Sequence, residues 1–315
     1  MKDTILFGDC RKTLPTITSK ARMCVTSPPY YGLRDYGGED SQIGQEQSPE
    51  EYVQELVKTF RYVRDVLTDD GTLWLNIGDS YYNYRSDGNY PQQTVSKTRQ
   101  DLPMNTPVRG NKLEGLKSKD LIGIPWMLAF ALRADGWYLR QDIIWHKPNP
   151  MPESVKDRCT KAHEYIFLMS KNKNYYYDNE AIKEPAKDWG TRDRSNGKYH
   201  NPGTGLSPHS GLTKSYDKRN KRSVWSVNKK PYKGAHFATY PRELIVPCIL
   251  AGSQRGDIVL DPFMGSGTTA MVAKELGRNY IGCELHEDYS NLIDKRLGLY
   301  ASLGTGGVAD TDDSD

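Results

Sequence analysis

Two short segments near opposite ends of this 315-residue chain constrain its fold more than any other feature. Thr26-Ser27-Pro28-Pro29-Tyr30 follows the apolar run Met23–Val25, and a glycine-rich segment, Asp261–Thr269, follows the apolar run Ile258–Leu260. Short apolar runs of this kind predict β-strands. In an open α/β sheet, ligands bind beyond the carboxyl ends of the strands, where the strand order reverses. The sequence therefore predicts that two strand-end loops meet there, one holding a cofactor and the other a reacting group.

The glycine-rich segment predicts a site for a nucleotide-like cofactor. Its two glycines permit close backbone approach, and its hydroxyl residues suit the start of a helix. The next strand ends at Glu284, about 20 residues further on, where an acid holds a pair of ribose hydroxyls. Neither Gly-Lys-Ser/Thr nor G-x-G-x-x-G is present, and Asp261 suits a cationic ligand better than a triphosphate. On its own, the segment also fits an ordinary strand–helix–strand unit with a solvated glutamate.

Two consecutive prolines dominate the first segment. Pro28 and Pro29 fix the backbone and remove two donors, which leaves their carbonyl groups as acceptors. Ser27 adds a hydroxyl group, and Tyr30 adds an aromatic face that can stack on a flipped base. Rigid acceptors beside a stacking ring suit an exocyclic amino group that has to be held and made nucleophilic. A Pro-Pro turn alone is usually a loop stiffener, so this interpretation depends on the pairing with the glycine-rich segment.

Both segments resemble those of DNA amino-methyltransferases. Thr26–Tyr30 is similar to the S/T/D-P-P-Y/F catalytic motif, and Asp261–Thr269 is similar to the D-P-F-x-G-S-G-T-T cofactor motif. The catalytic motif precedes the cofactor motif, which is the permuted order of the β group. Ala235–Leu244 resembles the segment before the glycine loop, and Phe7–Cys10 resembles a segment that helps to hold the cofactor's adenine. The resemblance covers most of the chain outside two polar insertions.

This resemblance implies S-adenosyl-L-methionine as the cofactor and double-stranded DNA as the partner. The expected cofactor residues are Asp9, Cys10, Thr26, Asp261, Pro262, Phe263, Gly265, Ser266, Gly267, Thr268 and Glu284. The expected catalytic residues are Ser27, Pro28, Pro29 and Tyr30. A flipped base would stack on Tyr30, while its amino group bonds to Ser27 and to the Pro28 carbonyl. Ser27 in place of Asp favours cytosine N4 as the target, with adenine N6 as the alternative.

Two other classes of function stay open on the sequence. An N-P-P-Y-type motif also serves RNA and protein-glutamine methyltransferases, although the permuted order and a basic insertion argue against both. A catalytically silent DNA-binding module would keep the fold, but the intact Ser27, Tyr30 and glycine loop argue against it. A homodimer and a cognate restriction endonuclease also stay open.

The charge distribution indicates a nucleic-acid surface. Between Pro185 and Lys233, twelve Lys or Arg stand against three Asp, with aromatic residues interleaved. This stretch, 185–233, is predicted to be a target-recognition insertion, and the alternative is a solvated linker. Its expected DNA contacts are Lys218, Arg219, Lys221 and Arg222. The polar stretch 81–119 is predicted to be a DNA-side loop. The rest divides into a catalytic half, 1–184, a cofactor half, 234–304, and an acidic tail, 305–315.

Composition limits the class of protein. Hydrophobic residues make up 37% of the chain, and no apolar run reaches the length of about 18 residues that a membrane span needs. The start lacks a charged, apolar and small-residue leader, and the five cysteines form no C-x-x-C pair, which favours a cytoplasmic protein with reduced thiols. Cys24 and Cys10 are expected to be packing residues. No metal site is expected, because His163-Glu164 lacks a second histidine at metal-binding spacing and is predicted at a strand edge.

Strands and helices alternate along the chain, which predicts a doubly wound, mostly parallel seven-stranded α/β sheet. The resemblance implies that this sheet has the Rossmann-like methyltransferase fold. The predicted strands are Thr4–Asp9, Arg22–Thr26, Thr72–Ile77, Trp137–Trp145, Ala162–Ser170, Asp257–Asp261 and Asn279–Glu284. The predicted helices are Ser48–Leu67, Leu121–Arg133, Pro241–Ala251, Thr268–Leu276 and Glu287–Leu297. The resemblance makes the strands from Arg22 and Asp257 central neighbours. It also makes Trp145–Pro150 a pocket wall, for which a plain strand-terminating turn is the alternative.

Overall fold

An eight-stranded sheet forms the centre of the molecule, with the strand order β1-β10-β9-β2-β3-β5-β4-β8. The computed structural model describes residues 1–32, 42–82, 113, 115–186, 217–229 and 240–302. Of the eight strands, β5 alone runs antiparallel to its neighbours, which confirms the predicted mostly parallel α/β sheet. The strands are β1 (Thr4–Phe7), β2 (Ala21–Thr26), β3 (Leu67–Ile77), β4 (Tyr138–His146), β5 (His163–Ser170), β8 (Val224–Ser226), β9 (Ile258–Asp261) and β10 (Asn279–Glu284).

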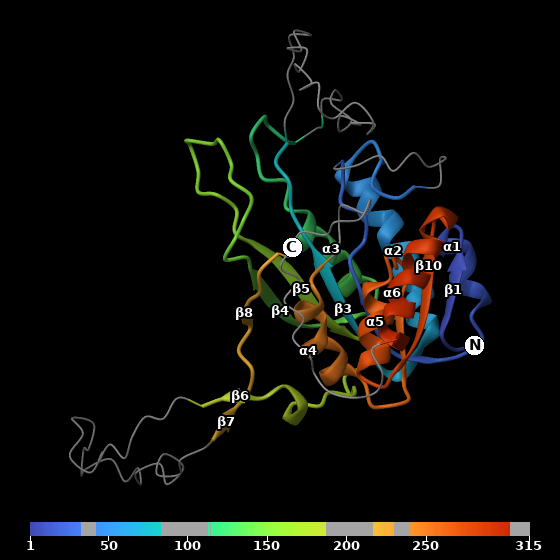
Figure 1. Ribbon diagram of the computed structural model, residues 1–315. Helices are drawn as coiled ribbons and strands as arrows, with labels where there is room; N and C mark the ends of the chain where they lie inside the picture. Colours follow the sequence, from blue (N-terminus) through green and yellow to red (C-terminus); the bar gives the residue numbers. More distant parts are fainter. Residues whose placement is uncertain (33–41, 83–112, 114, 187–216, 230–239, 303–315) are drawn as a thin grey trace, which may run out of the picture.

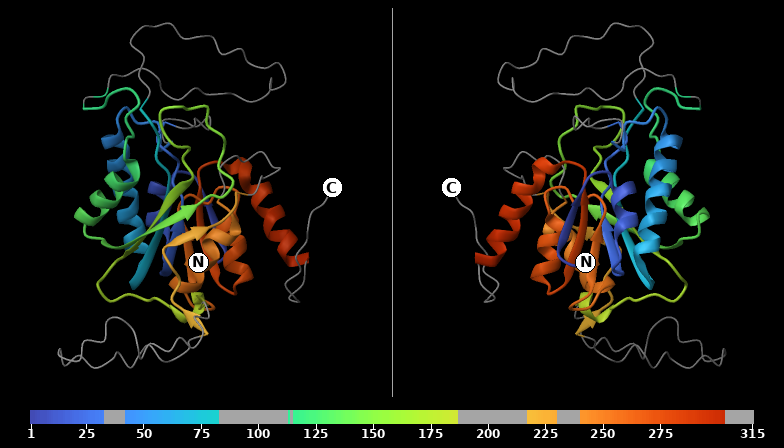
Figure 2. Two further views of the ribbon diagram at one scale, coloured as in Figure 1. Left: turned by 90° about the vertical axis from the view of Figure 1, so that its left-hand side faces the viewer. Right: turned by 90° about the vertical axis from the view of Figure 1, so that its right-hand side faces the viewer.

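Helices cover both faces of this sheet (Figure 1). Helices α1, α2 and α3 pack on one face; α4 and α5 pack on the other, with α6 against α5 (Figure 2). The helices are α1 (Cys10–Thr13), α2 (Pro49–Val66), α3 (Ile124–Ala134), α4 (Arg242–Gly252), α5 (Thr268–Glu275) and α6 (Ser290–Ser302). The result is the three-layer arrangement of a doubly wound α/β protein.

The central strands are apolar along their whole length because helices cover both of their faces. In β2, Cys24 belongs to the core beneath α2, whereas Met23 and Val25 belong to the core beneath α4 and α5. In β9, Leu260 and Val259 divide between the two cores in the same way. Parallel strands buried on both faces need such continuous apolar runs. This requirement is why two short runs, 235 residues apart, could be recognised as strands from the sequence.

Helix α2 begins where its sequence predicts. The Ser48 hydroxyl accepts a hydrogen bond from the Glu51 amide at 3.2 Å, and Pro49 occupies the first turn, where its missing donor costs nothing. The Glu51 carboxylate accepts from the amide of Gln47 at 3.1 Å, one residue earlier than in a standard capping box. The helix buries an apolar stripe that includes Tyr52, whose hydroxyl reaches the site described below.

All seven predicted strands and all five predicted helices are present, with ends that differ by a few residues. The strand β3 begins at Leu67 rather than Thr72, because the chain pairs with β2 directly after α2 ends. The predicted neighbours β2 and β9 do pair, and they pair in parallel. An eighth strand, β8, lies within the stretch predicted to be an insertion and pairs with β4. The sequence did not predict this strand because three residues are too few to show a hydrophobic period. Buried Trp225 anchors it in the core.

Parts of the predicted DNA surface lie outside the described residues. These are 83–112 and 114 in the polar loop, 187–216 and 230–233 in the recognition insertion, and the whole tail 305–315. Among the described residues, a small antiparallel ribbon joins β6 (Glu184–Pro185) to β7 (Lys218–Arg219). No helix in the part of the chain that the structure describes is both long and apolar enough to cross a membrane.

Candidate active site

One edge of the sheet gathers the residues on which the sequence interpretation depends. The parallel strands β1, β10, β9, β2, β3 and β4 all end there, and β5, which runs the other way, begins there. We call this edge the site edge. The chain order reverses between β9 and β2, and in open α/β sheets ligands bind outside the carboxyl ends of the strands at such a point. The two motifs found in the sequence follow these two strands.

A direct hydrogen bond joins the two motifs. The Thr26 hydroxyl, at the end of β2, donates to Asp261 Oδ1, at the end of β9, at 2.5 Å. Both residues are buried, and the bond closes the contact between segments that are 235 residues apart in sequence. Because the contact is buried and short, the catalytic loop and the glycine loop are held in a fixed relation. The predicted meeting of the two segments is therefore confirmed by the geometry.

Asp261 holds the glycine loop in place through its own hydrogen bonds. Besides Thr26, its carboxylate accepts from the Tyr240 hydroxyl at 3.0 Å, from the Phe263 amide at 3.0 Å and from the Thr269 hydroxyl. Burial raises the pKa of this carboxyl above its ordinary value, and the donated hydrogen bonds oppose that rise. The charge that the sequence analysis assigned to a cationic ligand thus faces the protein's own donors. Tyr240, which lies in the Ala235–Leu244 segment that resembles the family's segment before the glycine loop, completes this cluster.

The glycine loop has the backbone geometry of a ligand cradle. Gly265 and Gly267 have φ of 56° and 84°, values that favour glycine, and Gly267 caps helix α5. A Cβ atom on Gly267 would lie 3.2 Å from Ile293 of α6. Among the residues that the structure describes, the buried Ser266 Oγ has no hydrogen-bond partner. An orphaned hydroxyl in a glycine-rich turn suits a polar ligand group, since buried polar atoms are normally paired.

Glu284 ends β10 and turns its carboxylate toward the glycine loop. One oxygen accepts from the Gly265 amide at 2.7 Å and the other from the His286 amide at 3.0 Å. Burial raises the pKa of this carboxyl to about 7. An ionised carboxylate has about four acceptor positions, so it keeps capacity for a ligand hydroxyl beside its bonds from the backbone. The acid is therefore joined to the glycine loop, and its predicted role of holding ribose hydroxyls stays a prediction.

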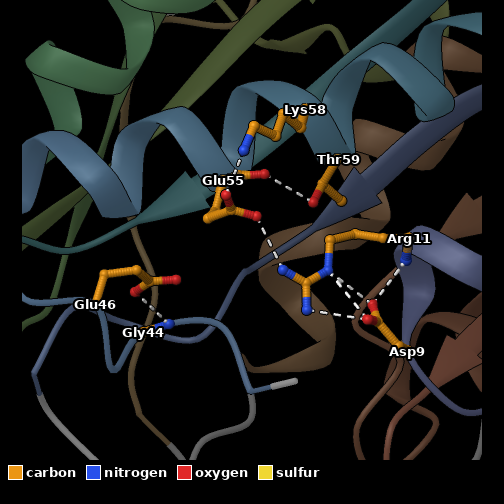
Figure 3. A network of polar contacts seen from close by, with 7 residues as sticks. All are labelled: Asp9, Arg11, Gly44, Glu46, Glu55, Lys58 and Thr59. Carbon is orange, nitrogen blue, oxygen red and sulfur yellow. Dashed lines mark hydrogen bonds and ion pairs between the residues drawn. The ribbon is translucent and has the colours of Figure 1, made fainter. Parts of the chain in front are cut away.

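Asp9 and Cys10 follow β1 at the same edge. The Gly8 amide donates to the Glu284 carbonyl at 2.8 Å, which ties this segment to β10. Asp9 caps α1, and the Arg11 side chain forms an ion pair with its carboxylate at 2.9 Å and with Glu55 of α2 at 2.9 Å (Figure 3). Burial would raise the pKa of Asp9, but the hydrogen bonds from Arg11 outweigh it and lower that pKa. Burial raises the pKa of the Cys10 thiol to about 12, as expected of a packing residue.

The two carbonyl groups of the Pro-Pro segment differ in their hydrogen bonds. The Tyr52 hydroxyl, on α2, donates to the Pro29 carbonyl at 2.7 Å, so that acceptor is already used. The Pro28 carbonyl has no such partner among the hydrogen bonds of the described residues. Ser27 is half-buried, at the point where the chain leaves β2. Pro29 is thus anchored to α2, whereas Pro28 is not.

The Tyr30 ring is packed against Gly78 and bonded to Glu164. A Cβ atom on Gly78, directly after β3, would lie 2.7 Å from Tyr30 Cε2, so only glycine fits there. The Tyr30 hydroxyl donates to Glu164 Oε2 at 2.8 Å. Burial raises the pKa of this hydroxyl well above its ordinary value; the charge of Glu164 adds to the rise, and a hydrogen bond with Ser27 opposes it. Sequence reasoning missed Gly78, because a lone glycine after a strand resembles any turn.

Comparison with known families identifies the chain. A model of the DNA methylase family (N6_N4_Mtase) matches residues 21–295, which include both motifs and most of the sheet. The chain belongs to this family. DNA methylases of this family are amino-methyltransferases that use S-adenosyl-L-methionine as their methyl donor. The resemblance drawn from the two motifs is therefore confirmed.

Relatives of this DNA methylase cover nearly all of its length. Type II methyltransferase M.SmaI of Serratia marcescens is 49% identical over 93% of this chain and 90% of its own. Type II methyltransferase M.Cfr9I of Citrobacter freundii is 48% identical over 93% of this chain and 87% of its own. Among solved structures, PvuII DNA methyltransferase (cytosine-N4-specific) has the same fold, with a TM-score of 0.60 and 17% identity over 94% of this chain and 86% of its own. TTHA0409, a DNA modification methylase of Thermus thermophilus solved with S-adenosyl-L-methionine, has a TM-score of 0.56 and 22% identity over 94% of this chain and 93% of its own.

The four cations predicted to contact DNA lie away from the site edge of this methylase. Strand β8 runs parallel to β4, so Lys218–Arg222, which precede β8, extend toward the amino end of β4. Figure 1 shows the β6–β7 ribbon at that far end of the sheet. Arg219 and Arg222 also form ion pairs with Glu184, at 3.0 and 2.7 Å. The structure therefore brings together the predicted cofactor and catalytic residues, but not these four.

Proposed function

We propose that this DNA methylase transfers a methyl group from S-adenosyl-L-methionine to N4 of a flipped cytosine in double-stranded DNA. The observation that carries the proposal is the buried Thr26–Asp261 hydrogen bond, which fixes the catalytic loop beside the glycine loop. Two features support the choice of cytosine. Ser27 stands where an aspartate would favour adenine, and the PvuII neighbour of the same fold is cytosine-N4-specific.

The residues at the site edge fit the cofactor. Glu284 would accept its ribose hydroxyls, and the orphaned Ser266 hydroxyl and the backbone of Gly265 would line the glycine loop around it. Asp9 would lie near its adenine, oriented by Arg11. When bound, S-adenosyl-L-methionine supplies an electrophilic sulfonium methyl group. The low polarity of the buried loop makes each of these contacts stronger than it would be in water.

The catalytic loop acts on the amino group of the substrate. In a nucleobase the amino lone pair is delocalised into the ring, which makes this nitrogen a poor nucleophile. Ser27 and the Pro28 carbonyl would accept hydrogen bonds from the two amino protons and favour a pyramidal nitrogen. Because Pro28 and Pro29 are rigid and Tyr52 anchors Pro29, the acceptors need no rearrangement at the moment of reaction. Positioning and preorganised acceptors would supply most of the rate gain, without a covalent enzyme intermediate.

Double-stranded DNA is the proposed partner, in line with the Type II methyltransferases that the chain resembles. Taking a base out of the duplex costs a few kcal/mol, which stacking on Tyr30 would partly repay. A homodimer and a cognate restriction endonuclease stay predictions of the sequence.

Digestion of enzyme-treated DNA to nucleosides, followed by mass spectrometry, tests the proposed base. We expect N4-methylcytosine. N6-methyladenine without N4-methylcytosine would overturn the base assignment and favour the second candidate, adenine N6, which the same site geometry would serve.

A further inference from the structure

A buried ion pair lies directly behind the catalytic tyrosine. The Lys147 ammonium contacts Glu164 Oε1, and the other carboxylate oxygen of Glu164 accepts from the Tyr30 hydroxyl at 2.8 Å. Lys147 is 5% exposed, although lysine is rarely buried. Asn76 adds a hydrogen bond from its side chain to the Tyr165 carbonyl at 3.1 Å, beside the pair. The cluster therefore combines residues of β3 and β5, the residue that follows β4, and the catalytic loop.

Fold stability does not explain this cluster. Taking two charges out of water usually costs as much as their attraction returns, and apolar residues of similar volume serve a core equally well. Burial lowers the pKa of Lys147, and Glu164 only opposes that shift. The Lys147 ammonium also lies over the Trp145 ring, with Nζ 4.3 Å from the ring centroid, so the charge faces an aromatic ring as well as Glu164. The presence of the Lys147–Glu164 ion pair at this position therefore indicates a role in holding the adjacent Tyr30 hydroxyl.

The hydrogen bond between the Tyr30 hydroxyl and Glu164 restricts the tilt of the ring, which packing against Gly78 does not restrict. Gly78 limits the distance of the Tyr30 ring from β3, because any Cβ atom there would collide with it. The same imagined Cβ atom would lie 3.3 Å from the Glu164 carboxyl carbon, so ring and carboxylate share one confined space. A bond at the far end of the ring then sets its tilt. The tilt of a stacking ring determines where the edge of a stacked base falls.

We propose that Glu164, with Lys147 as its counter-charge, is a positioning residue that sets the tilt of the Tyr30 ring on which the target base stacks. The correct tilt places the amino group of the base between Ser27 and the Pro28 carbonyl. Misplacement of reacting groups by about 1 Å can cost on the order of 100-fold in rate. The inference rests on the proposed function, because it needs a base stacked on Tyr30. It adds two residues whose side chains do not touch the reacting atoms.

Two variants remove the positioning bond by independent routes. Tyr30→Phe keeps the ring and deletes the hydroxyl. The charge-free double variant Lys147→Met with Glu164→Leu keeps the volume and deletes the acceptor, without leaving one buried charge unpaired. Tyr165→Phe is the matched control, because Tyr165 neighbours Glu164 on β5 and packs on Phe167 and Trp126 instead.

We expect kcat to fall about 10- to 100-fold in Tyr30→Phe and in the charge-free variant. The dissociation constant for S-adenosyl-L-methionine and the KM for DNA should stay near wild type, and Tyr165→Phe should behave as wild type. Combining the two changes should cost no more than Tyr30→Phe alone, because loss of the hydroxyl already removes its bond to Glu164 together with its contacts to Ser27 and Asn76. Losses that multiply, or wild-type turnover in the charge-free variant, would overturn the inference. If the wild-type enzyme methylates no DNA, the proposed function fails first, and this inference fails with it.

Discussion

Glu284 should make cofactor binding depend on pH near neutrality. Burial raises the pKa of its carboxyl from 4.5 to about 7, so the carboxyl is largely protonated below neutral pH. Ribose hydroxyls donate to an ionised carboxylate, which has more acceptor positions than the protonated acid. Binding should therefore favour the ionised form and release a proton at pH values below about 7.

The size of the effect follows from that pKa. A carboxyl with a pKa of about 7 is ionised in about one molecule in eleven at pH 6 and about ten in eleven at pH 8. If only the ionised form binds, affinity for S-adenosyl-L-methionine should rise about tenfold between these two pH values. Without cofactor, folding stability depends on pH in the opposite direction to cofactor affinity. A folded-state pKa above the unfolded value of 4.5 means that this carboxyl's contribution to stability is lost as pH rises from 4.5 to about 7.

Isothermal titration calorimetry at pH 6, 7 and 8, in buffers with different ionisation enthalpies, measures both the affinity and the protons released. Glu284→Gln is the matched control, because it keeps the shape and cannot ionise; its weaker binding should be independent of pH. A wild-type dissociation constant that does not change between pH 6 and pH 8 would refute the reasoning. So would an equal pH dependence in Glu284→Gln, since another group would then be responsible.

Three further predictions follow from the same geometry. Asp261→Ala removes the acceptor of four donors, of which the Tyr240 and Thr269 hydroxyls also bond to each other; with three groups left unpaired at about 1–3 kcal/mol each, denaturant unfolding should show a loss of about 3 kcal/mol or more. A loss below about 1 kcal/mol would contradict the role of this carboxylate in holding the loops. Ser27→Ala should bind cofactor normally and lose most turnover, which parallel calorimetry and kinetics would check; full turnover would remove Ser27 from the mechanism. If the basic stretch binds phosphates, Lys218→Glu with Lys221→Glu should weaken DNA binding and flatten the log–log salt slope by about 0.9 per lost contact, whereas exposed Lys173→Glu should not. Unchanged affinity and slope would make the stretch a linker.

The fold could be predicted from the sequence because each strand and helix of a doubly wound sheet has a hydrophobic pattern within its own residues. Each central strand is a short apolar run ended by a polar loop, and each helix has a readable stripe, as in α2. The two motifs then fixed which strands are neighbours, since a catalytic and a cofactor loop must meet. Strand β8 could not be predicted, because its pairing depends on an open edge of β4 rather than on its own three residues.

The site was predicted in part, and the missing residues share one physical reason. The motifs supplied Thr26, Ser27 and Glu284 because each directly follows or ends a strand. The resemblance placed Lys147 in a pocket wall, but its ion pair with Glu164 is a side-chain contact between different strand ends, which no spacing in the sequence encodes. The opposite holds for the four cations before β8, which the sequence identified but could not place in the fold. Their composition suggests DNA, but composition does not say at which edge of a sheet a segment lies.

The most direct test of the account is transfer of a labelled methyl group from S-adenosyl-L-methionine to double-stranded DNA, RNA and protein offered in parallel. Wild-type enzyme, Ser27→Ala and Glu284→Gln should be compared at saturating and at limiting cofactor. The account predicts label in an amino-methylated base of DNA alone, little label with Ser27→Ala at any cofactor concentration, and recovery of Glu284→Gln at saturating cofactor. Label in RNA or protein rather than DNA, or unimpaired transfer by Ser27→Ala, would contradict it.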